Sequence, residues 1–247
     1  MAKYILLGII QGLTEFLPVS SSGHLVIMQK VFGMTGEELA LPLVLHLGTI
    51  FALIIFFFKD ILNVLRNIKT LSLIFIVTII TGIIGITGKD FFEGLFGSPK
   101  MVAIALIITG IILILTRRFM DAKRETVNFK DALILGITQG IAIVPGISRS
   151  GITISTLLFR KIDRQTSFKF SFLASIPAIF GATLLEAGKI RLGIESNPIN
   201  FLLGITFSFL TGLIALWILR LILYKAKWHY FGYYCILVAI LTLLFLR

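Results

Sequence analysis

Two long apolar stretches of this chain are interrupted at their centres, and these interruptions limit what the chain can form. Residues 4–29 are broken by Pro18-Val19-Ser20-Ser21-Ser22-Gly23-His24, and residues 131–159 by Pro145-Gly146-Ile147-Ser148-Arg149-Ser150-Gly151. Each half is too short to cross a bilayer, which takes about 20 apolar residues. A helix–loop–helix that enters and leaves the membrane on one side fits, provided that protein buries its irregular backbone. The sequence therefore predicts two re-entrant hairpins.

The remaining apolar runs are long enough to be transmembrane helices. Of 247 residues, 57% are hydrophobic and only 14% are charged, whereas a soluble domain carries about 25% charged residues. We therefore expect an all-α polytopic membrane protein with six transmembrane helices plus two re-entrant helical hairpins. The six spans are predicted at 40–58, 71–88, 101–116, 170–187, 200–220 and 230–246.

The two interrupted stretches resemble each other, which predicts an internal duplication. Residues 7–13 (Leu-Gly-Ile-Ile-Gln-Gly-Leu) recur as residues 135–141 (Leu-Gly-Ile-Thr-Gln-Gly-Ile), an offset of 128. We divide the chain into a first repeat, 1–120, and a second repeat, 121–247. Each repeat has one hairpin and three spans, and because three is odd the second repeat must be inverted. Together they form one integrated membrane domain.

The basic residues predict orientation and partner class. The net charge is +11, and Lys and Arg lie between apolar runs, which favours membrane lipid headgroups over nucleic acid. The side that holds the N-terminus carries 7 of the 23 basic residues and the other side 15, with Arg149 inside a loop. We predict that the more basic side is cytoplasmic, that both termini are outside, and that the first hairpin opens outward.

Polar residues in the first interrupted stretch are candidates for chemistry. Glu15 lies one helical turn beyond Gln11, and a carboxylate at membrane depth usually faces a wet cavity or a partner. The alternative is a capping group near the membrane interface. Ser20, Ser21 and Ser22 offer three hydroxyls, of which at least two are expected to satisfy the loop. His24 follows them as a candidate acid or base, whereas His46 and His229 are assigned structural roles.

The second interrupted stretch predicts an anion site. Arg149 lies between Ser148 and Ser150, and a guanidinium binds phosphate oxygens in a bidentate manner. The N–H groups of the loop, including that of Gly146, and the start of the following helix would add to this site. Arg149 could instead be the buried partner of Glu15, and the two interpretations are compatible. Because the chain has no Walker loop, His-Glu-x2-His motif or Cys cluster, the residues alone indicate a membrane protein with a phosphate-type site, either enzyme or transporter.

The two motifs, at residues 11–24 and 145–151, resemble the undecaprenyl-diphosphatase family of the bacitracin-resistance type. The resemblance runs from end to end in length, span pattern and motif spacing. It implies hydrolysis of undecaprenyl diphosphate to undecaprenyl phosphate plus inorganic phosphate, which recycles the lipid carrier of cell-wall synthesis and confers bacitracin resistance. It also implies a bacterial plasma membrane location, an active site facing outward, a divalent cation (Mg²⁺ or Ca²⁺) and, often, a homodimer.

The resemblance also implies roles for individual residues. Glu15, with Gln11, would hold the cation, although many family members have a second Glu where this chain has Gln11. Arg149 would bind the terminal phosphate, with Ser21 as nucleophile and His24 as general base and acid. Contacts from Ser20, Ser22, Ser148, Ser150 and Gly146 would complete the phosphate site. In one alternative, metal-bound water attacks and Ser21 is a phosphate ligand; in another, the chain is a polyprenyl-phosphate transporter or flippase.

Overall fold

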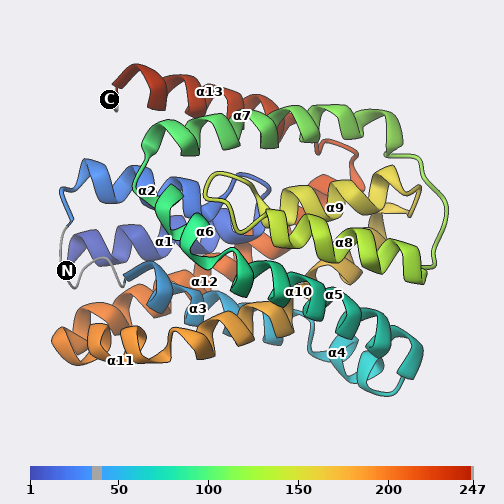
Figure 1. Cartoon of the computed structure of the whole chain (residues 1–247), viewed down its shortest axis with the longest axis horizontal. Helices are drawn as coiled ribbons and strands as arrows, with labels where there is room; N and C mark the ends of the chain where they lie inside the picture. The colour runs from blue at the N-terminus through green and yellow to red at the C-terminus, as the bar shows by residue number, and fades with distance from the viewer. Residues whose placement is uncertain (35–40, 246–247) are drawn as a thin grey trace.

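Every named element of this protein is a helix, and one isolated β-bridge joins Arg124 to Ile162. The computed structural model describes residues 1–34 and 41–245, so the first residue of the span predicted at 40–58 and the last of that at 230–246 lie outside the described residues. The helices (Figure 1) are α1 (Ala2–Phe16), α2 (Ser21–Val31), α3 (Leu41–Phe56), α4 (Phe58–Leu65), α5 (Ile68–Thr87), α6 (Lys89–Phe96), α7 (Pro99–Leu115), η2 (Thr116–Phe119, a 3-10 turn), α8 (Phe129–Ile141), α9 (Arg149–Phe159), α10 (Arg164–Leu185), α11 (Ala187–Ser196), α12 (Pro198–Tyr224) and α13 (Tyr230–Phe245).

Four of these helical segments are long and apolar enough to cross a membrane, which makes the chain a multi-pass membrane protein. They are α5, α7 extended to Phe119, α10 and α12, with 20 to 27 residues and mean hydropathies between 1.6 and 2.3. The helices α3 and α4 are bent by 72° at Phe57 and give a fifth candidate if they form one span. The described part of α13 has 16 residues, or about 24 Å at 1.5 Å per residue, against about 30 Å of hydrocarbon.

The span predicted at 170–187 begins earlier in the structure. Helix α10 starts at Arg164, because the side chain of Asp163 accepts hydrogen bonds from the N–H groups of Gln165 and Thr166, at 2.9 and 3.2 Å. An apolar window misses such a start, since the first two turns carry Arg164 and Lys169. The capping residue, not the hydrophobic run, sets where this helix begins.

Two helical hairpins enter the molecule from opposite ends and meet at their tips. Figure 1 shows α1–α2 entering from the left and α8–α9 from the right, with their loops together in the middle. The hydroxyl of Ser20 donates to the carbonyl of Ile147 at 3.4 Å, and that of Ser150 donates to the carbonyl of Leu17 at 3.3 Å. The irregular backbone of each loop is therefore covered by protein, as a polar backbone within an apolar medium requires.

Small residues let these hairpins pack closely against long helices from the opposite half of the chain. Gly8 and Gly12 of α1 face α12, where a Cβ on Gly8 would lie 2.5 Å from the carbonyl oxygen of Gly204. Gly136 and Gly140 of α8 face α5 in the same way. Glycines four residues apart on one helix face are a common means of close helix packing in membranes.

A buried carboxylate fixes the base of the α8–α9 hairpin. The side chain of Asp131, at the start of α8, has no solvent exposure and accepts two hydrogen bonds from Arg124, at 2.6 and 3.0 Å. Arg160, which follows the last residue of α9, donates to the same carboxylate at 2.8 Å. The preceding loop and both ends of the hairpin are thus joined at one point, which fixes where the hairpin tip can reach.

We expect Gly12→Ala to lower the thermal unfolding temperature of the protein in detergent, by the equivalent of about 1–3 kcal/mol. A Cβ at Gly12 would lie 2.1 Å from the Oγ1 of Thr211 and 2.4 Å from the carbonyl oxygen of Ser208, so α1 and α12 must separate. Gly82→Ala on α5 is the matched control, because a Cβ there meets nothing within 4 Å. Equal unfolding temperatures for the two variants would contradict close packing of α1 on α12.

Candidate functional site

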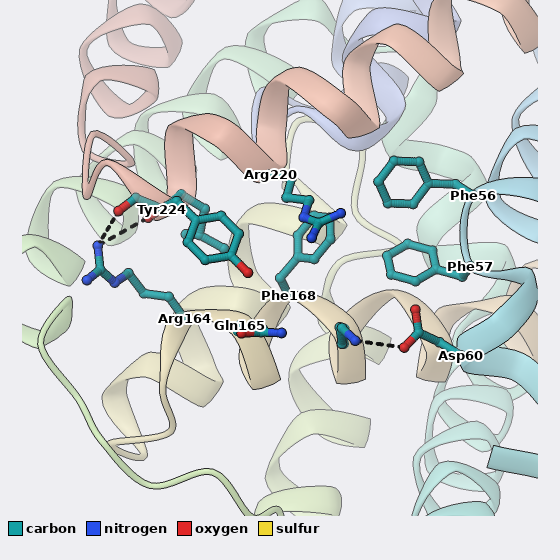
Figure 2. A pocket seen from close by; sticks show the side chains of 10 residues that line it. Phe56, Phe57, Asp60, Arg164, Gln165, Phe168, Arg220 and Tyr224 are labelled. Atoms are coloured by element: carbon teal, nitrogen blue, oxygen red, sulfur yellow. Dashed lines mark hydrogen bonds and ion pairs between the residues drawn. The ribbon is translucent and has the colours of Figure 1, made fainter. Parts of the chain in front are cut away.

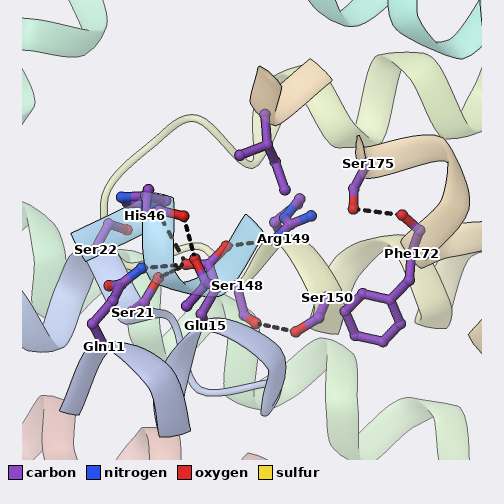
Figure 3. A network of polar contacts seen from close by, with 12 residues as sticks. Gln11, Glu15, Ser21, Ser22, His46, Ser148, Arg149, Ser150, Phe172 and Ser175 are labelled. Carbon is purple, nitrogen blue, oxygen red and sulfur yellow. Dashed lines mark hydrogen bonds and ion pairs between the residues drawn. The ribbon is translucent and has the colours of Figure 1, made fainter. Parts of the chain in front are cut away.

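Among the residues that the structure describes, the carboxylate of Glu15 lies at the meeting point of the two hairpins. Glu15, in the last turn of α1, has a side chain that is 6% exposed (Figure 3). One of its oxygens pairs with the guanidinium of Arg149 from the other hairpin. The other oxygen accepts hydrogen bonds from the Ser21 hydroxyl at 2.6 Å and the Gln11 amide at 3.1 Å, and it lies 3.5 Å from Nε2 of His46. Four of its neighbours therefore come from α1, α2, α3 and α9.

The position of Arg149 is set by the start of α9. Arg149 is the first residue of that helix, and the hydroxyl of Ser148 caps it by accepting from the N–H of Gly151 at 3.1 Å. The hydroxyls of Ser148 and Ser150 lie 3.3 Å apart. Because the side chain of Arg149 is still 16% exposed, its guanidinium has both a buried partner and access to the surroundings, which suits a group that changes partner when an anion arrives.

Gly146 lies behind this cation, against α7. Its φ is +97°, and a Cβ there would lie 2.4 Å from the carbonyl oxygen of Val102. Its own carbonyl accepts a hydrogen bond from Thr109 at 3.0 Å, and the same hydroxyl accepts from the N–H of Ser148 at 3.1 Å. Only glycine fits such a position without strain. Gly146 therefore anchors the loop that presents Arg149.

The serine cluster divides into structural hydroxyls and one that reaches the carboxylate. Ser20 has a φ of 66° and caps α2 by accepting from the N–H of Gly23 at 3.3 Å. Its hydroxyl also lies 3.2 Å from that of Ser22. Of the three serines, Ser21 is the one whose hydroxyl donates a hydrogen bond to Glu15. The structure thus brings Ser21 to the position that a reacting or phosphate-binding hydroxyl would need, and leaves Ser20 to shape the turn.

His24 has partners other than Ser21. Its Nδ1 lies 2.9 Å from the carbonyl oxygen of Ser20, and since a carbonyl only accepts, Nδ1 carries the proton. Its Nε2 then accepts from the hydroxyl of Tyr234 on α13, at 2.8 Å. The predicted contact between His24 and the Ser21 hydroxyl is therefore not formed here, because both ring nitrogens are already hydrogen-bonded. Tyr234 lies 210 residues away in the sequence, which is why the sequence alone could not indicate it.

His46 is a site residue that the sequence analysis assigned to a structural role. Its Nδ1 lies 2.7 Å from the carbonyl oxygen of Pro42, so this nitrogen donates and Nε2 is left facing Glu15. Neutral His46 would direct a lone pair at the carboxylate, whereas protonated His46 would form an ion pair with it. The signal was present in the sequence, because an ionisable side chain within an apolar span is rare and usually faces a polar partner.

The carboxylate of Glu15 and the amide oxygen of Gln11 are the groups at this site that would suit a divalent cation. The Oε1 of Gln11 is buried and has no hydrogen-bond partner in the part of the chain that the structure describes. A carboxylate and an amide oxygen are ligands that Mg²⁺ and Ca²⁺ accept, and Mg²⁺ commonly takes one or two carboxylates with substrate phosphates completing its shell. The described residues hold no group of three His, Cys, Asp or Glu suited to a metal.

Comparisons with known proteins place this arrangement in a named group. The sequence matches the protein-family model described as "Bacitracin resistance protein BacA" over residues 4–241. It is 42% identical to "Undecaprenyl-diphosphatase" of Halothermothrix orenii, over 98% of this chain and 96% of the relative. The proteins of the same name from Carboxydothermus hydrogenoformans and Thermotoga petrophila are 42% and 41% identical, over 93% and 97% of this chain and 91% and 98% of each relative.

We expect Arg149→Gln to destabilise the protein, by about 3 kcal/mol, because it leaves the Glu15 carboxylate buried without its cation. The double variant Glu15→Gln/Arg149→Gln should recover a large part of that loss, since no unpaired charge remains. Thermal unfolding of the purified proteins in detergent measures both. A double variant that is less stable than Arg149→Gln would show that the two side chains are not coupled.

Proposed function

We propose that this chain, which belongs to the bacitracin resistance protein BacA family, is an integral membrane undecaprenyl-diphosphatase. It hydrolyses undecaprenyl diphosphate to undecaprenyl phosphate and inorganic phosphate, and so recycles the lipid carrier and confers bacitracin resistance. One observation carries the chemistry: the Ser21 hydroxyl rests on a buried carboxylate beside the Arg149 guanidinium. A flippase would need the Arg149 guanidinium to hold the phosphate, but it would not need a hydroxyl placed to attack the phosphorus.

The proposal includes six spans and two re-entrant hairpins, divided into inverted repeats at 1–120 and 121–247. The order of helices supports it, since α1, α2, α3, α5 and α7 have counterparts in α8, α9, α10, α12 and α13. Packing is reciprocal as well: α1 packs against α12, and α8 against α5. The two hairpins also enter from opposite ends (Figure 1), as inversion of one repeat requires.

We further propose that the catalytic site is reached from outside the cell, in the plasma membrane, with both termini outside. The ends of α9 and α12 and the starts of α5, α8 and α10 gather at the right of Figure 1. Together with Lys59 and the basic residues between α7 and α8, these segments carry 15 of the 23 basic residues, which favours a cytoplasmic position for that end. The α1–α2 hairpin opens at the other end. The family resemblance adds a homodimer to the proposal.

Substrate binding begins with an exchange of partners at Arg149. The prenyl chain stays among lipid tails, while the diphosphate reaches the two loops. Arg149 leaves Glu15 and forms a bidentate pair with the terminal phosphate, and the hydroxyls of Ser22, Ser148 and Ser150 lie near enough in the fold to add hydrogen bonds. Binding of the diphosphate to Arg149 and release of Glu15 from Arg149 therefore occur together.

The reaction then uses Ser21 as nucleophile. Its Oγ attacks the terminal phosphorus, the bond from that phosphorus to the bridging oxygen breaks, and undecaprenyl phosphate leaves. The hydroxyl proton passes to Glu15, whose oxygen is 2.6 Å away, within the range for proton transfer. Water afterwards hydrolyses the phosphoserine and restores the hydroxyl. Arg149 neutralises charge on the transferring phosphate oxygens throughout. In the alternative, water attacks directly and Ser21 remains a phosphate ligand.

His46 replaces the charge that Arg149 removes. When Arg149 binds the phosphate, Glu15 loses its ion pair with the guanidinium. The Nε2 of His46 still faces the same carboxylate, at 3.5 Å. A proton taken from Ser21 can therefore be held between Glu15 and His46 during the transfer. His24, hydrogen-bonded to Tyr234, remains the alternative base, and it would first have to give up one of its two contacts.

The divalent cation is part of the proposal, with Glu15 and Gln11 as the residues that would hold it. When bound, such a cation neutralises phosphate charge and orients the diphosphate. The unpartnered Oε1 of Gln11 supports this assignment. With one carboxylate in place of two, this chain should bind the cation weakly in the absence of substrate.

The first test is phosphate release from undecaprenyl diphosphate by the purified protein in detergent, with Mg²⁺, with Ca²⁺ and with chelator. We expect metal-dependent release that falls at least about a hundredfold in Glu15→Gln and in Arg149→Gln. The control is the double variant of these residues, which should be stable yet inactive. No release by folded wild-type protein with either metal would reject the phosphatase and favour transport.

The second test separates the nucleophile and the two histidines. With substrate labelled in its terminal phosphate and an acid quench, we expect label on Ser21 in the wild type and none in Ser21→Ala. His46→Ala should slow label transfer about a hundredfold or more, whereas His24→Ala, the matched control, should have the smaller effect. A fully active Ser21→Ala would exclude the covalent route. The opposite order of the two histidines would assign the base to His24.

A further inference from the structure

A second polar pocket lies at the basic end of the molecule, away from the catalytic cluster. It occupies the space between the bend after α3, the first turns of α10 and the last turns of α12, with a volume of about 150 Å³ (Figure 2). His46 and Phe56 are ten residues apart on α3, which corresponds to about 15 Å along the helix. The pocket is therefore separate from the carboxylate that His46 contacts.

Phenylalanine side chains fill the interior between the two places. Phe16, which follows Glu15, contacts Phe172 with ring centroids 5.7 Å apart. Phe172 in turn contacts Phe57 at 5.8 Å and Phe168 at 5.1 Å, and these last two line the pocket. All four rings are buried. An anion in the pocket is thus shielded from the catalytic groups by packed aromatic side chains, so the pocket cannot be an extension of the catalytic site.

The pocket has more positive than negative charge. Its lining includes Arg164, Lys169 and Arg220 but a single carboxylate, that of Asp60. Lys169 neutralises Asp60 through a 2.8 Å ion pair. Two guanidinium groups therefore remain without a carboxylate among the lining residues.

The contacts of these two arginines leave their charge uncompensated. Arg164 donates to the carbonyl oxygen of Tyr224 at 2.7 Å, and Arg220 lies over the ring of Tyr224, 5.9 Å from its centroid. A carbonyl and an aromatic ring orient a cation but do not neutralise it. Both groups therefore keep their charge at the pocket, and a guanidinium can donate two hydrogen bonds to one phosphate.

The surroundings of the pocket indicate an anion that carries an apolar chain. Phe56 and Leu223 line the pocket beside the arginines. Leu221, which follows Arg220 on α12, is 41% exposed on the surface of a span candidate. A phosphate group could occupy the cationic part while acyl chains follow the exposed face of α12. Basic pockets between transmembrane helices at the cytoplasmic side are typical sites for anionic headgroups.

We propose that this pocket is a second, non-catalytic site that binds the phosphate headgroup of an anionic lipid, at the end of the protein opposite to the opening of the α1–α2 hairpin. The proposal does not depend on the catalytic assignment, because none of its residues contacts Glu15 or Arg149. Binding there would tie α3, α10 and α12 together at the basic end.

The test is calorimetric titration of the purified protein in neutral detergent with dihexanoyl phosphatidic acid, and separately with dihexanoyl phosphatidylcholine and inorganic phosphate. We expect one saturable phosphatidic acid site that neither of the other two compounds occupies at the same concentration. Arg220→Gln should weaken it about tenfold, as expected for a charged hydrogen bond. Gln165→Glu, at an exposed lining residue, should weaken it similarly by adding a negative charge.

Two controls make the result specific. Lys225→Gln removes an equal charge from the residue after α12, outside the pocket lining, and should change the affinity less than twofold. Arg149→Gln should retain binding, because the catalytic cation is not involved. Undiminished phosphate release by Arg220→Gln shows that this variant is folded.

Three outcomes would overturn the proposal. An equal loss of affinity for phosphatidic acid in Arg220→Gln and Lys225→Gln would show a general attraction of the lipid to the basic surface. A loss of affinity for phosphatidic acid in Arg149→Gln would show that the lipid binds in the catalytic site. Displacement of phosphatidic acid by inorganic phosphate at equal concentration would identify a free-phosphate site, in which the apolar wall has no part.

Discussion

The pair between Glu15 and Arg149 is the interaction on which the centre of this molecule depends. A carboxylate and a guanidinium are both costly at membrane depth, and each is retained only because the other is there. The pair also fixes the fold locally, since its partners come from hairpins that enter from opposite ends. Contacts that position the loop between α1 and α2 therefore also affect the position of the loop between α8 and α9. The glycine contacts of α1 and α8 and the Asp131 cluster at the hairpin base serve that end.

In the proposed mechanism, the substrate phosphate competes with Glu15 for the guanidinium of Arg149, so the pair that stabilises the folded protein also takes part in binding. The resting pair is a closed arrangement in which Ser21, Gln11 and His46 all contact the carboxylate. Withdrawal of Arg149 leaves Glu15 with neighbours that can accept or donate a proton but with one permanent charge fewer. In that proposal, Glu15 becomes a stronger base for the Ser21 hydroxyl only after phosphate has taken Arg149 from it.

The sequence predicted the features that depend on local pattern. Apolar runs located most of the helices, the interrupted stretches located the two helical hairpins, and charges within apolar stretches indicated Glu15 and Arg149, which the structure pairs. It failed where a position depends on contacts between distant segments. His46 was assigned a structural role because nothing polar adjoins it in the sequence, and His24 was paired with Ser21 although Tyr234, from the far end of the chain, holds its ring. The start of α10 was missed because a cap, rather than hydrophobicity, determines it.

The distance in sequence between the two members of the central pair has a consequence for biosynthesis. Glu15 and Arg149 are 134 residues apart, so at about 5–20 residues per second the carboxylate waits roughly 7 to 27 seconds for its cation to be translated. During that interval the carboxylate can contact only groups that precede Arg149 in the chain. Gln11 and Ser21 lie within six residues of Glu15 and hydrogen-bond to it. The first hairpin can therefore enter the membrane with its carboxylate already hydrogen-bonded. The nascent chain can thus insert an acidic residue long before the arginine that will neutralise it exists.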